Sequence, residues 1–113
     1  MKICCRALLV LPALTMSLMI ALGEGDVAKG RTAFGRRCAM CHGNSGEGNE
    51  AIGKALGVII PDLGSKEVQA LDDSVLKKVL LEGKGKMQAV NLSDAEVDDV
   101  IAFIRSLKKP LPK

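Results

Sequence analysis

The feature that most constrains this 113-residue chain is a cluster of three reactive side chains within five consecutive positions, Cys38-Ala39-Met40-Cys41-His42. His42 is the only histidine of the sequence, and the two other cysteines lie near the N-terminus, at positions 4 and 5. Residues three apart lie on one side of a helical turn, so the Cys38 and Cys41 thiols are expected to face the same way. The fold therefore has to accommodate the group or the bond that these three side chains form.

Zinc binding and disulfide chemistry explain this cluster less well than a haem does. A structural zinc site needs four protein ligands, usually Cys and His, and the chain after position 23 offers only these three. A thioredoxin-type disulfide needs a βαβ context, and no alternating strand pattern is visible. A plain disulfide leaves His42 without a role. Covalent haem uses all three side chains, with thioethers to Cys38 and Cys41 and with His42 as the proximal iron ligand.

The same inventory predicts the second axial ligand. With a single histidine, ligation of the iron by two histidines of this chain is excluded. After position 23 the only methionines are Met40, which lies between the two cysteines on the proximal side, and Met87. Met87 ends a polar, glycine-rich segment, Gly83-Lys84-Gly85-Lys86-Met87, which is a poor place for an ordinary core methionine. We therefore predict Met87 as the distal iron ligand.

The N-terminal segment is typical of an export signal. Lys2 and Arg6 supply a short positive start, and residues 7–23 are uncharged and rich in Leu, Ala, Met, Val and Ile. The small residues of Ala21-Leu22-Gly23 predict cleavage before Glu24. The alternative is an uncleaved anchor, because 17 uncharged residues are at the lower limit for a membrane-spanning helix. We expect a signal peptide over residues 1–23 and an exported, periplasmic or extracytoplasmic domain, or one anchored to the membrane by this segment.

The composition of the remaining 90 residues excludes one class of partner and indicates a bound group. They carry 14 basic and 13 acidic residues, a net charge of +1. This balance lacks the basic stripe and stacking aromatics of a nucleic-acid interface, so no nucleic-acid partner is expected. These residues include no Trp or Tyr, and their only phenylalanines are Phe34 and Phe103. Such a chain has a thin core of its own, which is better explained if a large apolar group is bound inside it.

Helical patterns predict a small all-α domain. Four helices are expected, at about 27–40, 65–70, 73–82 and 94–107, with candidate N-caps at Asp26, Ser65, Asp72 and Ser93. Ser93 and Glu96 form a capping box, and Val97, Val100 and Ile101 then repeat at helical spacing. The segment 43–57 contains five glycines and predicts a flexible surface loop. The expected architecture is about four helices around one haem.

In these residues the chain resembles the small monohaem, class I cytochromes c of bacteria, and the resemblance covers nearly all of residues 24–113. Gly30 and Phe34 match the family's N-terminal helix, in which the glycine lets the C-terminal helix cross closely and the aromatic ring packs beside it. Val100 and Phe103 occupy the matching positions of the C-terminal helix. The resemblance implies the cytochrome c fold for this domain.

The resemblance also implies contacts to the haem. Gly-Lys-Gly-Lys-Met at 83–87 is similar to the family's distal-ligand loop. Pro61 resembles the proline whose backbone carbonyl accepts a hydrogen bond from the proximal histidine, here His42, and such a bond would orient the imidazole. The chain departs from many relatives in having Gln88 instead of proline after the methionine, and in lacking a Trp or Tyr to contact a haem propionate.

Site chemistry and resemblance together imply electron transport. A neutral thioether opposite histidine stabilises ferrous iron, and with both axial positions filled no site remains for substrate or oxygen. We expect a monomeric one-electron carrier between membrane or periplasmic redox proteins, with no small-molecule substrate and no enzyme activity. Lys54, Lys84 and Lys86 are candidates for steering an acidic partner. Two alternatives stay open: a haem c subunit bound stably in a larger respiratory oxidoreductase, and a haem-based sensor or peroxidase with a labile Met87.

Overall fold

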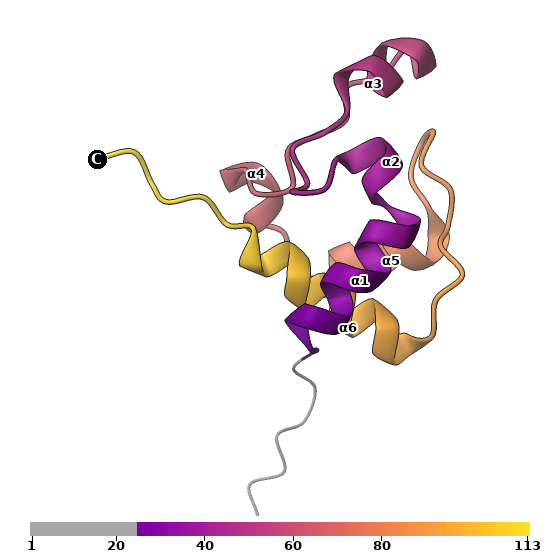
Figure 1. The fold of residues 1–113 in the computed structure, drawn as a ribbon, viewed down its shortest axis with the longest axis vertical. Coiled ribbons are helices and arrows are strands. Elements are labelled where there is room, and N and C mark those ends of the chain that lie inside the picture. Colours follow the sequence, from indigo (N-terminus) through magenta and orange to yellow (C-terminus); the bar gives the residue numbers. More distant parts are fainter. Residues whose placement is uncertain (1–24) are drawn as a thin grey trace, which may run out of the picture.

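The computed structural model describes residues 25–113, so the predicted signal peptide lies outside the described residues. Six helices form this part of the chain: α1 (Val27–Arg37), α2 (Ala39–His42), α3 (Glu50–Leu56), α4 (Lys66–Gln69), α5 (Asp73–Glu82) and α6 (Asp94–Ser106) (Figure 1). No β-strand occurs among these residues, only one isolated bridge between Lys84 and Met87. The predicted all-α class is confirmed, with six helices instead of about four. Within the same residues, no helix combines the length and the apolar character needed to span a membrane.

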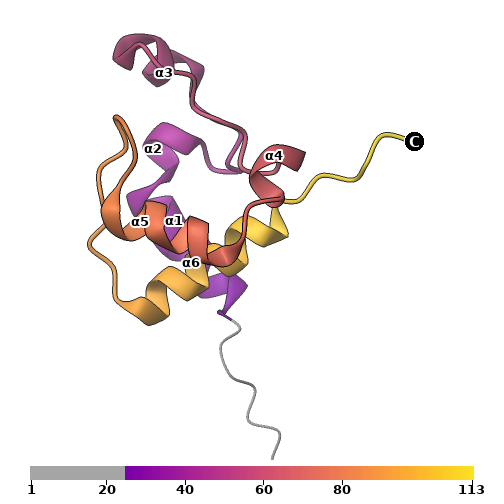
Figure 2. The same cartoon turned by 180° about the vertical axis from the view of Figure 1, so that it is seen from behind.

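The first and last helices, α1 and α6, cross and pack against each other (Figures 1 and 2). Gly30 lies at the crossing, where a Cβ atom would come within 1.9 Å of the backbone oxygen of Asp99. Only a glycine allows this approach of two helix backbones. The Phe34 and Phe103 rings pack beside the crossing at a centroid distance of 5.0 Å and an interplanar angle of 58°. The predicted crossing of α1 and α6 is therefore confirmed.

One core joins α1, α5 and α6 with the segment around α4. Its buried members are Ala33, Phe34, Cys38, Leu63, Val68, Leu76, Leu80, Val97, Val100, Ile101, Phe103 and Ile104. On α5, Leu76 and Leu80 are buried, whereas Val75 is 41% exposed. Residues four apart share one face of a helix, and the position before Leu76 is turned about 100° away from that face. The apolar stripe of α5 is thus narrower than its sequence indicates.

The first predicted helix is wrong in its length. Helix α1 ends at Arg37, and Cys38 leaves helical geometry with φ −122° and ψ −32° before α2 begins at Ala39. Two hydrogen bonds from Asn49, from its side chain to the Met40 oxygen (3.1 Å) and from its backbone N–H to the Cys41 oxygen (2.8 Å), tie the new turn to a later segment. The cysteine motif therefore stands on a short helical turn of its own.

The predicted loop over 43–57 is also wrong, because it contains α3. The Asn49 side chain accepts a hydrogen bond from the Ile52 N–H and caps the helix, and Gly57 closes it in the left-handed conformation with φ +69°. The segments before and after α3 run side by side where they join the helical body, and a hydrogen bond from the Leu63 N–H to the Gly46 oxygen (2.8 Å) links them. Helix α3 consequently stands at the end of an arm, residues 43–62, that projects from the helical body (Figures 1 and 2).

Candidate haem site

The two cysteines of the motif are held by the junction of α1 and α2. Cys38 is buried and Cys41 is half-buried, and neither forms a disulfide. Burial raises the pKa of the Cys38 thiol, and the nearby Cys41 raises it further. Two adjacent free thiols on one short turn are what covalent attachment of a haem at two points requires.

His42 ends α2 directly after the second cysteine, and its Nδ1 atom is buried without a hydrogen-bond partner among the described residues. Burial lowers the pKa of His42, which favours the neutral imidazole, the form that binds metals. The Phe34 ring lies 6.3 Å from the imidazole, between centroids, at 51°. This contact joins His42 to the α1–α6 core and was not predicted from the sequence, although Phe34 itself was assigned to that core.

Pro61 lies on the returning side of the arm, opposite the turn that follows His42. Gly48 donates a hydrogen bond to the His42 oxygen (2.6 Å), and the Pro61 oxygen is 3.7 Å from where a Cβ atom on Gly48 would lie. Since the Nδ1 atom of His42 has no partner, the hydrogen bond to the Pro61 carbonyl that the resemblance implied is absent from this structure. Its formation around a bound haem stays a prediction.

Met87 is presented by a tight hairpin after α5. Lys84 and Met87 exchange two backbone hydrogen bonds of 2.9 Å each, and Gly83 and Gly85 have φ of +79° and +57°. The Met87 side chain is half-buried and packs against the core, as does that of Ala39 in α2. In both ribbon views the hairpin lies level with α2 along the long axis of the molecule (Figures 1 and 2).

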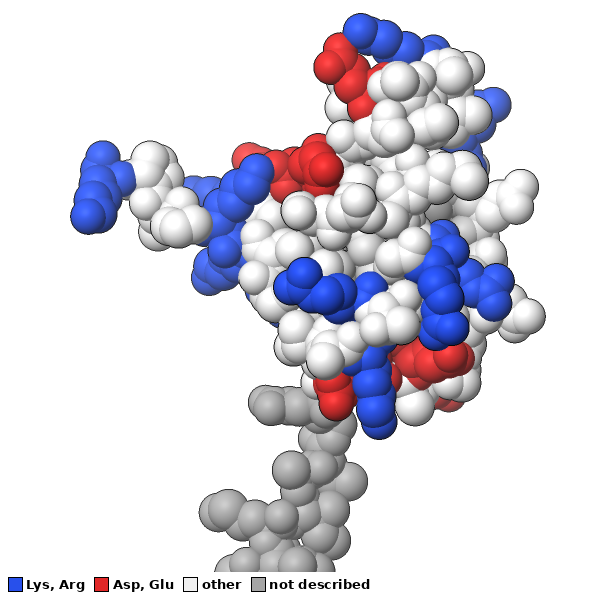
Figure 3. Space-filling view, in the orientation of Figure 1, with Lys and Arg blue, Asp and Glu red and all other residues white. Residues whose placement is uncertain are grey.

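The donor set and the surrounding surface fit a haem. Two free thiols, a neutral imidazole with a buried unpartnered nitrogen and a thioether make up the set expected for a covalently bound haem with histidine and methionine ligands. Two apolar side chains are largely exposed: Met40, between the two cysteines, at 77%, and Ile59, on the arm, at 96%. The surface over α2 is largely uncharged, whereas acidic side chains lie beside the base of the arm (Figure 3). In the described part of the chain, no group of three His, Cys, Asp or Glu side chains could hold a bare metal ion.

These features define a small helical haem protein, and comparison with known proteins identifies its family. The model of the cytochrome c family matches residues 27–108, so the chain belongs to the cytochrome c family. The structure of the KustC0563 c-type cytochrome superposes with a TM-score of 0.61 at 26% sequence identity, covering 71% of this chain and 98% of that protein.

A curated relative is a much longer protein than this chain. Thiosulfate dehydrogenase of Stutzerimonas stutzeri (strain A1501) is 31% identical over 97 residues, which is 78% of this chain. The match spans 29% of that enzyme, so this chain corresponds to less than a third of its length. Membership of the cytochrome c family implies a covalently bound c-type haem and haem-based electron transfer with redox partners.

Proposed function

We propose that this chain is a one-electron carrier in which a single haem is attached to Cys38 and Cys41 and its iron is held by His42 and Met87. The hairpin at 83–87 is the observation that supports this proposal most. It holds the Met87 thioether against the core, level with the turn that carries the two cysteines. The single Cys-X-X-Cys-His motif and the single histidine of the sequence support one haem per chain.

The chain's own residues determine how such a centre behaves. When bound, the haem supplies one-electron exchange between ferrous and ferric iron. The Met87 thioether is neutral and favours ferrous iron, and the neutral His42 imidazole completes a closed coordination that leaves no place for a substrate. The α1–α6 crossing and the hydrogen-bonded hairpin hold both ligand-bearing segments in fixed positions. A centre that keeps its geometry in both redox states suits repeated transfer of single electrons.

The partners that fit this centre are redox proteins on the far side of the membrane from the cytoplasm. The export signal predicted over residues 1–23 supports a periplasmic or extracytoplasmic location, and covalent haem attachment fits an exported protein. The carrier would accept electrons from one respiratory-type oxidoreductase and deliver them to another. It would do so without a small-molecule substrate of its own.

Absorption spectroscopy of the matured protein tests the axial ligands. The oxidised protein should show the weak near-red band of sulfur bound to ferric iron, and Met87→Ala should abolish it. Met40→Ala is the matched control, since it removes the other methionine and should leave the band intact. A wild-type protein that lacks the band and whose ferrous form readily binds carbon monoxide would have an open distal position. That result would favour the sensor or peroxidase alternative over the electron carrier.

A second candidate function, a haem c subunit of a larger oxidoreductase, is favoured by the thiosulfate dehydrogenase relative. Size-exclusion chromatography of the protein from its native host distinguishes the two. A carrier should elute at the mass of the haem-bound monomer, whereas a subunit should co-elute with its enzyme. Purified protein should also fail to couple thiosulfate oxidation to hexacyanoferrate(III) reduction if it is a carrier, and turnover would assign it an enzymatic role.

A further inference from the structure

The short helix α2 carries Cys41 and His42, and together with Cys38 it forms what we call the cysteine turn. The first carbonyl of α2, that of Ala39, accepts a hydrogen bond of 2.8 Å from the Gly43 N–H. A helix of 4 residues cannot satisfy its remaining carbonyls internally, so they need water, a side chain or another backbone segment as partner. The pairing of these carbonyls therefore decides how firmly the cysteine turn is held.

Two consecutive residues at the base of the arm, Gly48 and Asn49, donate to all three remaining carbonyls. The His42 oxygen accepts from the Gly48 N–H (2.6 Å), and the Cys41 oxygen accepts from the Asn49 N–H (2.8 Å). The Nδ2 atom of the Asn49 side chain donates to the Met40 oxygen (3.1 Å). The end of the cysteine turn is thus hydrogen-bonded to the arm, and Asn49 contributes through both its backbone and its side chain.

Asn49 is also engaged on the side of the arm. Its Oδ1 atom accepts from the Ile52 N–H (3.2 Å) as the N-cap of α3, and its backbone oxygen accepts from the Gly53 N–H (2.9 Å). Aspartate and serine cap helices as well as asparagine does, and this chain uses them at Asp26 and Ser65. Aspartate lacks a donor, however, and the serine hydroxyl ends one bond earlier than the amide. Asparagine is therefore the capping residue that can also hold the cysteine turn.

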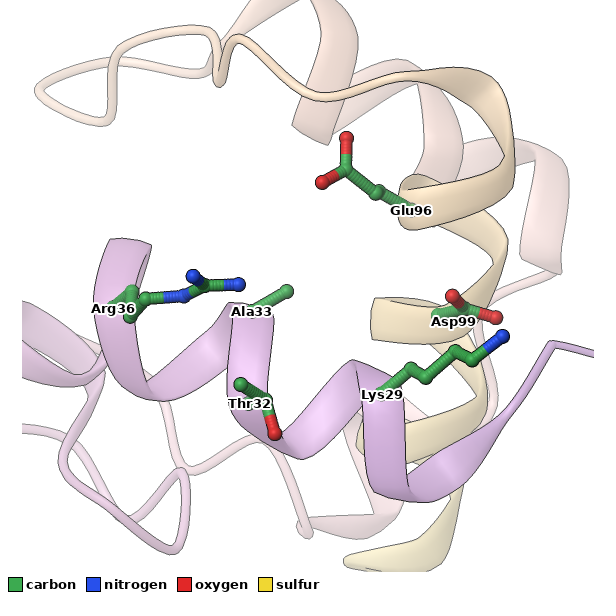
Figure 4. A pocket seen from close by; sticks show the side chains of 6 residues that line it. All are labelled: Lys29, Thr32, Ala33, Arg36, Glu96 and Asp99. Carbon is green, nitrogen blue, oxygen red and sulfur yellow. The ribbon is translucent and has the colours of Figure 1, made fainter.

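The beginning of the cysteine turn is held in a different way, through α1. This helix is fixed to α6, where the Asp99 carboxylate accepts a hydrogen bond of 2.7 Å from the Asp26 N–H. Next to this contact, charged side chains of both helices face each other across a hollow of about 270 Å³ (Figure 4). Helices α1 and α6 thus position Cys38, whereas residues 48–49 are bonded to the end of the turn at which His42 lies.

We propose that Asn49 is a positioning residue of the redox centre, which sets the orientation of the His42 imidazole by fixing α2 to the base of the arm. This inference rests on the proposed function, since it takes His42 as an iron ligand. The Nδ1 atom of His42 is buried without a partner among the described residues, and Pro61 lies on the returning side of the arm, opposite the same turn.

The two sides of the arm are close enough for Asn49 to affect this approach. A Cβ atom on Gly48 would lie 2.6 Å from the Ile60 oxygen and 3.7 Å from the Pro61 oxygen, so the returning side lies directly against the residue before Asn49. A hydrogen bond to the free nitrogen of a ligating imidazole orients the ring and raises its basicity. Asn49 therefore determines both the backbone that carries the ring and the place of the segment that can reach its Nδ1 atom.

Nuclear magnetic resonance of the haem-bound protein tests this role without an activity assay. Asn49→Ser keeps a cap on α3 and loses the amide donor, whereas Asn49→Ala loses both. In the ferric protein, both variants should shift the haem methyl resonances, which depend on the orientation of the imidazole plane. In the ferrous protein, the His42 Nδ1 proton should exchange with solvent about 5-fold faster, as expected when one net hydrogen bond no longer opposes opening.

Ser65→Ala is the matched control, because the Ser65 side chain caps another short helix, α4, by accepting from the Val68 N–H. This control should lower the resistance to urea as Asn49→Ala does, but it should leave the haem methyl resonances and the His42 proton exchange unchanged. Wild-type signals in Asn49→Ser, whether or not Asn49→Ala alters them, would show that Asn49 acts at most as a helix cap and would overturn the proposal.

The near-red band separates this proposal from the carrier function. Its absence from the wild-type protein would remove Met87 from the iron, while the His42 signals would still decide the role of Asn49. The expected result is a band that persists in both Asn49 variants together with altered His42 exchange and haem methyl resonances. A band lost in both variants with unaltered His42 exchange would instead place the effect of Asn49 on the distal side and contradict the proposal.

Discussion

Gly30 and Asp99 touch backbone to backbone at the crossing of α1 and α6: a Cβ atom on Gly30 would lie 1.9 Å from the Asp99 oxygen and 3.0 Å from the Phe103 Cβ. Backbone atoms cannot move aside as a flexible side chain can, so any larger residue must push the helices apart. Because the same two helices form the core against which His42 and its neighbour Phe34 lie, this contact bears on the haem site as well as on stability.

Gly30→Ala should therefore destabilise the haem-bound protein by roughly 3 kcal/mol, near the upper end for overpacking a core. Urea unfolding followed by far-UV circular dichroism measures this change. The control is Gly35→Ala in the same helix, where a Cβ atom would meet nothing within 4 Å. That substitution should leave stability unchanged or raise it by about 0.5–1 kcal/mol, since alanine favours the helix. Equal effects of the two substitutions would contradict the close crossing.

The capping box of α6 predicts a pH dependence of stability. The Ser93 N–H, then its hydroxyl, and then Arg36 and Arg37 hold the pKa of Glu96 below its ordinary value of 4.5. A carboxyl with a lowered folded-state pKa adds stability above its unfolded pKa and loses that stability as pH falls through the folded pKa. Glu96→Gln should flatten the fall in unfolding free energy below pH 4.5. Glu50→Gln, outside the box, is the control for charge alone, and an equal flattening there would contradict this role.

Much of the helical framework was predictable because its signals are local. The Ser93–Glu96 box and Gly83 mark their helix ends within the sequence itself, and the structure has both. Helix α3 was missed because five glycines in 43–57 resemble a loop, although Asn49 and Gly57 are ordinary capping residues. The break at Cys38 could not be predicted in this way. It is accompanied by hydrogen bonds from Asn49, a tertiary contact that helical periodicity does not record.

The candidate site was likewise predictable only in part, because some of its features are local in sequence and others depend on the fold. Cys38, Cys41 and His42 were brought together by sequence adjacency, and Met87 was found by counting methionines. Two features needed the structure: the unpartnered Nδ1 atom of His42, and the pairing of Lys54, one of the lysines predicted to steer a partner, with Glu50. Both depend on side-chain positions between segments or along one helix face, which residue identity alone does not determine.

Arg105 ties the end of α6 to the connection between α4 and α5. Its guanidinium donates to the Asp73 carboxylate at 2.9 and 2.7 Å, to the Gln69 oxygen at 3.0 Å, and to the Leu71 oxygen. Lysine cannot reproduce this fork of donors, so Arg105→Lys should cost about 1–3 kcal/mol in unfolding free energy. Lys78→Ala is the control, since its exposed pair with Glu82 should be worth less than about 0.5 kcal/mol. Similar losses in chemical denaturation would mean that Arg105 acts only as a surface ion pair.

The conformation of the Met87 hairpin predicts that a residue outside the coordination sphere controls the sulfur–iron bond. Gly83 has φ +79°, and a Cβ atom on it would come within 2.7 Å of the Met87 oxygen and 2.9 Å of the Ala89 nitrogen. Gly83→Ala should therefore displace Met87 and weaken or abolish the near-red band of the oxidised protein. Gly85→Asn is the matched control at the tip, because φ +57° is tolerated by asparagine and nothing lies within 4 Å of its Cβ position. The control should keep the band, and an intact band in Gly83→Ala as well would show that the hairpin does not position the thioether.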